Sequence, residues 1–162
     1  MIRALGRADS IFDATLGLAG DALHAAAVLD CDVIGSEASP AVFSLLERAL
    51  PDLAATQPAA ARIQPLLGSA LEHLRALGPD SVDAVMFAPM YASAASAAPG
   101  YELFREVAVH APLDSATLLA GVTAARHRVV FKADRGQAPP NLWRLAEPLR
   151  GKAVDWYVHK KR

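Results

Sequence analysis

Short apolar runs alternate along the chain with longer stretches in which apolar residues recur at helical spacing. Each short run has the length and composition of a buried strand, and each longer stretch has the period of a helix packed on one face. Strands are predicted over residues 10–13, 32–37, 62–67, 82–87 and 127–132, and helices over residues 21–29, 39–50, 69–77, 101–109 and 114–125. Strands that alternate with helices favour a parallel sheet covered on both faces.

The last part of the chain departs from this alternation. Residues 141–147 predict a short helix, and residues 148–159 predict a β-hairpin that turns at Gly151 and Lys152. The expected fold class is therefore α/β, with a Rossmann-like, mostly parallel sheet, an antiparallel C-terminal hairpin and helices on both faces. A chain of 162 residues suits one domain, so we expect a single domain over residues 1–162.

Proline and small residues set several boundaries. Ser39 followed by Pro40 is typical of a helix start, and Pro51 is expected to end that helix and to open a linker over residues 51–61. Pro65 lies inside a predicted strand and cannot donate a ladder hydrogen bond, which suits either an edge strand or the entry of a strand. Residues 92–100 form a loop of Ala, Ser, Pro and Gly.

Composition and charge exclude several kinds of protein. The net charge is −1, which gives no overall basic field for nucleic acid. One cysteine and scattered histidines predict neither a disulfide nor a metal site. No apolar stretch is long enough for a membrane span or a signal peptide, so we expect a reduced, cytoplasmic setting.

A loop of small residues follows the first predicted strand and opens the next helix: Asp13-Ala14-Thr15-Leu16-Gly17-Leu18-Ala19-Gly20-Asp21. Gly17 and Gly20 let the backbone turn tightly and approach a ligand closely. Amide groups at the helix start favour a carboxylate or phosphate, whereas Asp13 and Asp21 suit an ammonium group and repel a diphosphate. A plain strand–helix connection with capping aspartates is the alternative interpretation.

Glu37 stands at the end of the second predicted strand, where an acidic side chain can accept hydrogen bonds from both hydroxyls of a ribose. Sites for NAD and for S-adenosylmethionine (SAM) share this feature. The glycines in the preceding loop are spaced G-x-x-G instead of G-x-G-x-x-G, which argues against a dinucleotide. A solvated glutamate at a helix start is the other interpretation of Glu37.

The exit of the fourth strand, Ala88-Pro89-Met90-Tyr91, lies where ligands bind in open α/β sheets. Pro89 stiffens the chain, and Tyr91 offers an aromatic face for a planar substrate, although an ordinary strand exit has the same composition. Four basic residues near the fifth strand would meet a polyanion if they shared a face, but solvated charges are the preferred interpretation; they are Arg126, Arg128, Lys132 and Arg135. Asp83 is interpreted as an edge charge.

Two segments together resemble the first two motifs of class I SAM-dependent methyltransferases: DATLGLAGDAL from Asp13 and VIGSE ending at Glu37. The chain is similar to the group of the small-subunit ribosomal RNA guanine-N2 methyltransferase, which also includes uncharacterised bacterial members. That group pairs a D-A-T-x-G-L-x-x-D-A loop with a D-P-M-[FY] motif. Residues 86–91 match the second motif apart from Ala88, and residues 110–114 and 128–136 are also similar.

The resemblance implies a seven-stranded methyltransferase sheet that binds SAM or S-adenosylhomocysteine. In that arrangement the 13–21 loop would surround the methionine moiety, and Glu37 would bind the ribose. Ser69 would approach the adenine, at a position where relatives often have an acidic residue. The expected cofactor-binding residues are Asp13, Thr15, Gly17, Gly20, Asp21, Glu37 and Ser69, and the expected catalytic positions are Ala88, Pro89 and Tyr91.

Ala88 is the main departure from the family pattern. In amino-methylating relatives, an acidic or amide side chain at this position accepts a hydrogen bond from the target nitrogen and aligns it for attack. Alanine cannot accept that bond. The sequence therefore leaves three outcomes open: a different acceptor, a slower enzyme, or a non-catalytic SAM-binding or partner-binding module.

The resemblance also implies a possible methyl acceptor, which is guanine N2 of ribosomal RNA or another nucleic-acid base. The absence of basic residues from the 92–100 loop weakens this assignment. So does the short stretch before the first strand, because the rRNA-modifying relatives have a larger N-terminal region.

Overall fold

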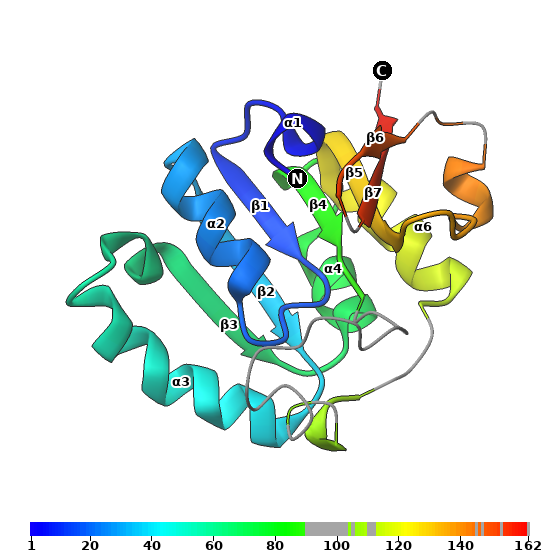
Figure 1. Cartoon of the computed structure of the whole chain (residues 1–162). Coiled ribbons are helices and arrows are strands. Elements are labelled where there is room, and N and C mark those ends of the chain that lie inside the picture. Colours follow the sequence, from blue (N-terminus) through cyan, green and yellow to red (C-terminus); the bar gives the residue numbers. More distant parts are fainter. Residues whose placement is uncertain are drawn as a thin grey trace.

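The computed structural model describes residues 1–89, 104, 106–109, 113–144, 146, 148–152 and 154–161. Within these residues a seven-stranded sheet has the order β3-β2-β1-β4-β5-β7-β6 (Figure 1). The strands are β1 Ser10–Asp13, β2 Asp32–Glu37, β3 Ile63–Leu67, β4 Val82–Phe87, β5 Ala125–Asp134, β6 Leu149–Arg150 and β7 Val154–Lys160. The helices are α1 Ile2–Leu5, α2 Gly20–Leu29, α3 Pro40–Ala54, η1 Pro58–Arg62, α4 Ala70–Leu77, α6 Ser115–Ala124 and η2 Asn141–Trp143.

Strands β1 to β5 are parallel, and β7 is antiparallel to both β5 and β6. The predicted fold class and the C-terminal hairpin are therefore confirmed. Asp13 is in register with Gly35 on β2 and with Met86 on β4, so these strands end at the same edge of the sheet. The strand order reverses at β1 and β4, which is where open α/β sheets place their ligands.

The apolar core has two layers because side chains alternate between the faces of the sheet. One layer packs α1, α2 and α3 against one face, where Ile11, Val33 and Met86 are buried. The other packs α4, α6 and Trp143 against the opposite face, where Phe12 and Phe87 are buried. Every residue of β4 is buried, since this strand lies at the centre of the sheet.

Two predicted boundaries are wrong. Helix α3 continues through Pro51 to Ala54, and the expected 51–61 linker is instead the end of this helix followed by η1. Pro51 is exposed, whereas Leu50 is buried and Leu53 packs on the core, so apolar contacts hold the last turn despite the missing N–H. The predicted 141–147 helix is only the short η2, with residues 145 and 147 outside the described part.

Other predicted boundaries are confirmed. β3, which contains Pro65, is an edge strand, one of the two placements that this proline suits. Ser39 caps α3 by accepting a hydrogen bond from the Val42 N–H, and Asp114 caps α6 by accepting one from the Thr117 N–H. The predicted 92–100 loop lies outside the described residues, and so do residues 101–103 and 105 of the predicted 101–109 helix, whereas residues 104, 106 and 107 are helical as expected.

Charged side chains fasten the amino ends of the central strands. The Asp83 carboxylate accepts hydrogen bonds from the amides of Asp9 and Ser10, at 2.9 and 3.1 Å, and forms an ion pair with Arg126. Arg128 donates to the Ala4 carbonyl at 3.1 Å. Arg126 is exposed, as expected of a solvated charge, although it also pairs with Asp83, whereas Arg128 is only partly exposed. The interpretation of Asp83 as an edge charge is wrong, because its carboxylate is buried on a central strand.

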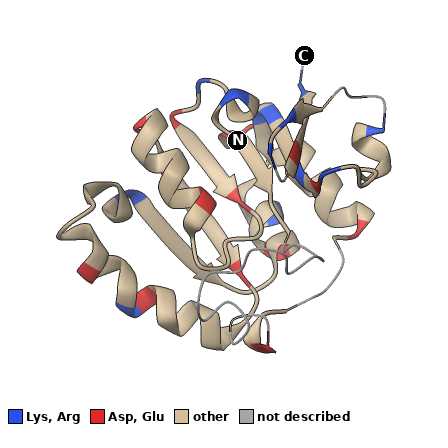
Figure 2. Cartoon of the chain, viewed as in Figure 1, with Lys and Arg blue, Asp and Glu red and all other residues tan. Residues whose placement is uncertain are grey.

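Lysine and arginine residues lie on several segments near α1, β5 and β7, while α3 carries charges of both signs (Figure 2). Among the described residues, none of the helices combines the length and the apolar character that a membrane crossing requires.

Candidate functional site

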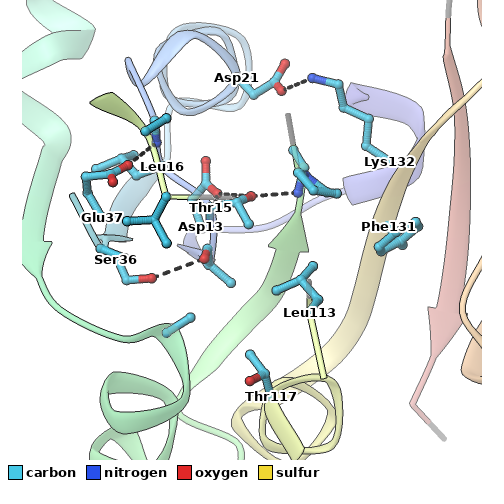
Figure 3. Close-up of a pocket in the computed structure, with 18 of the residues that line it drawn as sticks. Asp13, Thr15, Leu16, Asp21, Ser36, Glu37, Leu113, Thr117, Phe131 and Lys132 are labelled. Atoms are coloured by element: carbon cyan, nitrogen blue, oxygen red, sulfur yellow. Dashed lines mark hydrogen bonds and ion pairs between the residues drawn. The ribbon is translucent and has the colours of Figure 1, made fainter. Parts of the chain in front are cut away.

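A cleft of about 1100 Å³ opens at the carboxyl ends of β1, β2, β4 and β5. It is lined by residues from the 13–21 loop, the strand ends, the start of α4 and the start of α6 (Figure 3). The cleft brings together nearly all residues that the sequence singled out: Asp13, Thr15, Gly17, Gly20, Asp21, Glu37, Ser69, Ala88 and Pro89. Tyr91, the remaining one, lies outside the described residues.

Asp13 is the last residue of β1, and its side chain is almost fully buried, at 1% exposure. One carboxylate oxygen, Oδ1, accepts hydrogen bonds from the Thr15 amide at 2.9 Å and from the Thr15 hydroxyl at 3.3 Å. Burial raises the pKa of Asp13 to about 7, because a carboxylate loses hydration there, and nearby Asp21 adds to the rise. A buried carboxyl with such a pKa favours a cationic neighbour.

The 13–21 loop is shaped by close approach to β2. Gly17 has a φ of 53°, in the left-handed region that favours glycine. Gly35 on β2 lies against Leu16, and a Cβ at Gly35 would stand 2.6 Å from the Leu16 side chain. Sequence reasoning did not single out Gly35, although a glycine inside a strand often marks a close approach of another segment. Gly35 therefore lets the loop pack directly over the sheet.

Glu37 ends β2 and is held by backbone amides on both sides. Its Oε2 atom accepts a hydrogen bond from the Gly17 amide at 3.0 Å, and its Oε1 atom accepts one from the Ser39 amide at 2.6 Å. Only 8% of the residue is exposed, and burial raises its pKa although both amides oppose the rise. The carboxylate is thus fixed in orientation, and each oxygen keeps acceptor capacity for a hydroxyl group.

Asp21 in the first turn of α2 forms an ion pair with Lys132, whose Nζ lies 2.6 Å from the Asp21 Oδ2 atom. The Lys132 side chain is only 10% exposed, and its Nζ is 5.7 Å from the ring centroid of Trp156. The interpretation of Lys132 as a solvated charge is wrong. The 13–21 loop therefore presents two aspartates to the cleft, Asp13 and Asp21, and Asp21 is already paired with Lys132.

The exit of β4 is tied to the 13–21 loop by one side chain. The Ala88 amide donates a hydrogen bond to the Thr15 hydroxyl at 2.7 Å. In Figure 3, Thr15 lies between Asp13 and the end of β4. Ser69 is the N-cap residue of α4 and lines the cleft, but its side chain makes no capping hydrogen bond.

Sequence reasoning missed the wall of the cleft on the β5 side. Phe131 on β5 and Thr117 on α6 line it together with Leu113, Pro139 and Pro140. Phe131 and Thr117 belong to apolar patterns that signal burial, and only the strand order places them beside β4. Within the described part of the chain, no group of three or more His, Cys, Asp or Glu side chains is placed to hold a metal ion.

A protein-family model described as "Putative SAM-dependent methyltransferase" matches residues 2–154. The uncharacterized protein YpiP of Bacillus subtilis is 32% identical over 147 residues, which is 86% of this chain and 57% of that protein. Ribosomal RNA small subunit methyltransferase J of Pseudomonas paraeruginosa is 32% identical over 162 residues, 94% of this chain and 60% of that protein. The chain thus spans less than two thirds of the length of these relatives.

Solved structures agree with the sequence relatives. The crystal structure of a SAM-dependent methyltransferase from Neisseria gonorrhoeae has a TM-score of 0.69 and 30% identity, and the match covers 98% of this chain and 64% of that one. An RNA methyltransferase from Salinibacter ruber, at 14% identity and a TM-score of 0.53, shares the fold alone. The resemblance that the sequence motifs indicated is confirmed: the chain belongs to the SAM-dependent methyltransferase family.

Proposed function

We propose that this chain binds SAM in the cleft and transfers its methyl group to a nitrogen or oxygen atom of an acceptor. One observation carries the proposal: Asp13 and Glu37, at the ends of the neighbouring strands β1 and β2, face the same cleft, and the β4 exit, Ala88–Pro89, follows the strand on the other side of β1. When bound, SAM supplies an electrophilic methyl group on a positively charged sulfur.

The residues present fit this ligand. Asp13 would hold the cationic amino-acid end, since a positive charge nearby favours the ionised form of its carboxyl. Glu37 is fixed by two amides and would accept hydrogen bonds from the ribose hydroxyls. Gly17 lines the cleft with its backbone, and Ser69 lines the part of the cleft that the adenine would reach.

The β4 exit, Ala88–Pro89, would orient the acceptor. Holding two reactants in line lowers the barrier of a transfer reaction by removing much of its entropic cost. Ala88 offers no side-chain acceptor, so the proton of a methylated nitrogen would leave to another group or to water. The Phe131 and Pro139 side of the cleft would exclude water from the reacting atoms.

A nucleic-acid base is the acceptor class that we propose, with ribosomal RNA guanine N2 first. The support is the similarity to two proteins named ribosomal RNA small subunit methyltransferase J. Among the described residues that line the cleft, Lys132 is the only lysine or arginine.

The direct test is calorimetric titration with SAM and S-adenosylhomocysteine, with NAD as the control ligand. We expect binding of the first two and none of NAD. Asp13→Asn should abolish binding, whereas Asp52→Asn, which removes an exposed carboxylate from α3, should leave it unchanged. Transfer is then measured with labelled SAM in RNA and protein fractions of a cell extract. Absence of heat with both adenosyl ligands would refute the proposal.

A second candidate is a SAM-binding module without catalysis, which Ala88 favours because it removes the acceptor-positioning side chain of the family motif. This candidate predicts SAM binding without labelled transfer by the wild-type chain. Transfer by the wild type into any fraction rules it out.

A further inference from the structure

Thr15 occupies a position between the two halves of the cleft. Its hydroxyl donates to the Asp13 carboxylate at 3.3 Å and accepts from the Ala88 amide at 2.7 Å. Its own amide also donates to Asp13, at 2.9 Å. The Thr15 hydroxyl therefore acts as a donor toward the 13–21 loop and as an acceptor toward the exit of β4.

The Ala88 contact replaces a regular bond of the sheet. The Ala14 amide donates to the Met86 carbonyl at 2.9 Å, and a parallel ladder would continue with the Ala88 amide donating to the Ala14 carbonyl. Instead, the Ser36 hydroxyl donates to the Ala14 carbonyl at 3.2 Å, and the Ala88 amide turns to Thr15. A side chain, not the β1 backbone, thus sets the direction in which β4 leaves the sheet.

We propose that Thr15 is a positioning residue for methyl transfer, whose hydroxyl fixes the β4 exit at Ala88 relative to Asp13 and so holds the acceptor in line with the cofactor. The inference rests on the proposed function. It gives Thr15 a role other than the expected cofactor contact, because the residue links the 13–21 loop to the exit of β4. Because Ala88 takes part through its backbone, the link does not depend on the side chain at that position.

The test compares Thr15→Val, which removes the hydroxyl at nearly constant shape, with Thr15→Ser, which keeps it. Thr56→Val is the control, because the Thr56 hydroxyl is exposed and, among the described residues, bonds only to the Leu53 carbonyl of the preceding turn. Thermal unfolding establishes that each variant is folded. Thr15→Ala removes the hydroxyl as well and replaces the valine variant if that variant does not fold.

The first measurement needs no ligand: amide hydrogen exchange of Ala88, followed by NMR. We expect exchange at least about tenfold faster in Thr15→Val than in the wild type, since the amide loses its partner, and near-normal protection in Thr15→Ser. Equal protection of the Ala88 amide in the wild type and in Thr15→Val would overturn the link itself.

The second measurement separates binding from transfer. At saturating SAM, we expect Thr15→Val to transfer label about ten- to a hundredfold more slowly, with the dissociation constant for SAM within about threefold of the wild type. Thr15→Ser should recover most of the rate. A weakened SAM affinity with an unchanged saturated rate would make Thr15 a cofactor contact and overturn the inference.

The outcome for the wild type distinguishes this inference from the proposed function. A wild-type chain that binds SAM but labels no fraction refutes transfer, and with it the role of Thr15 in transfer. A wild-type chain that transfers label, with Thr15→Val equally fast, refutes the inference alone.

Discussion

Asp13 is the residue in which the demands of folding and of ligand binding conflict. The folded chain raises its pKa from 3.8 to about 7, chiefly because burial removes hydration. Between these pH values the folded state binds more protons at Asp13 than the unfolded state does. Stability from this group therefore falls as pH rises from about 4 to about 7, and a cationic ligand would offset the loss.

Asp13→Asn should stabilise the ligand-free chain at pH 8 while it abolishes SAM binding. Asparagine is an uncharged isostere that can still accept the Thr15 hydrogen bond through its carbonyl oxygen. We expect a gain of roughly 2 kcal/mol in the free energy of unfolding at pH 8, shrinking toward pH 4, measured by denaturant unfolding at both pH values. A variant that is less stable than the wild type at pH 8 would contradict this account of Asp13.

The affinity for SAM should depend on pH in the opposite sense. Binding of a cation favours ionised Asp13, and with a pKa of about 7 the ionised fraction rises from roughly a tenth at pH 6 to a half at pH 7. We expect the dissociation constant to fall about fivefold over this interval, with release of protons on binding at pH 6. Titrations at pH 6 in buffers of different ionisation enthalpy measure that release. An affinity that is flat over this range would show that Asp13 does not meet the cationic end.

Ala88→Asp restores the side chain of the family motif and should increase transfer to an amino acceptor at least about tenfold. The backbone amide that bonds to Thr15 is unchanged by the substitution. Ala88→Ser, which adds polarity without a carboxylate, is the matched control. Labelled transfer into RNA measures both. A carboxylate that leaves the rate at the wild-type value would indicate an acceptor other than an amine.

At the scale of elements, the sheet is fastened at the end opposite the cleft. Asp83 on β4 holds the amides of Asp9 and Ser10, which lead into β1, and it pairs with Arg126 on β5. Burial alone would raise the pKa of Asp83, but the two amides and Arg126 together lower it below 3.8. One carboxylate thus connects the starts of three adjacent strands.

Asp83→Ala should destabilise the chain by about 2–3 kcal/mol at pH 7, because it leaves two amides without an acceptor and removes the ion pair with Arg126. Since the folded pKa of Asp83 is depressed, its stabilisation is present above the unfolded value and is lost as pH falls through the lower, folded value. Denaturant unfolding of the wild type and the variant should therefore converge only in strong acid. SAM affinity should change less than twofold, and a large loss of affinity would mean that this end of the sheet shapes the cleft.

The boundary of α3 shows where local patterns are insufficient. Ser39 and Pro40 predict its start because capping is decided by neighbouring residues. Its end could not be predicted in the same way, since burial of Leu50 and packing of Leu53 on the core outweigh the helix-breaking effect of Pro51. Tertiary contacts, which local propensity does not contain, fix that end.

At the scale of the whole molecule, local sequence patterns predict some parts of the cleft, whereas other parts depend on tertiary contacts. Alternating strands and helices predict that Asp13 and Glu37 lie at one edge of a sheet, because each directly follows a strand of the parallel series. The Asp21–Lys132 pair could not be predicted, since its partners are 111 residues apart in the chain. It depends on β5 lying beside β4, and only the complete strand order determines that neighbourhood.

Ligand binding should stabilise the whole chain, because the cleft is lined from the first strand to the segment after β5. A ligand at a hundredfold excess over its dissociation constant adds about 2.7 kcal/mol to the free energy of unfolding. For a chain of this length that corresponds to a rise in Tm of roughly 5–10 °C, measured by calorimetric scanning with SAM or S-adenosylhomocysteine. NAD should give no rise, and Asp13→Asn should respond to neither adenosyl ligand. An equal rise in Tm for Asp13→Asn and the wild type would place the ligand away from the strand ends.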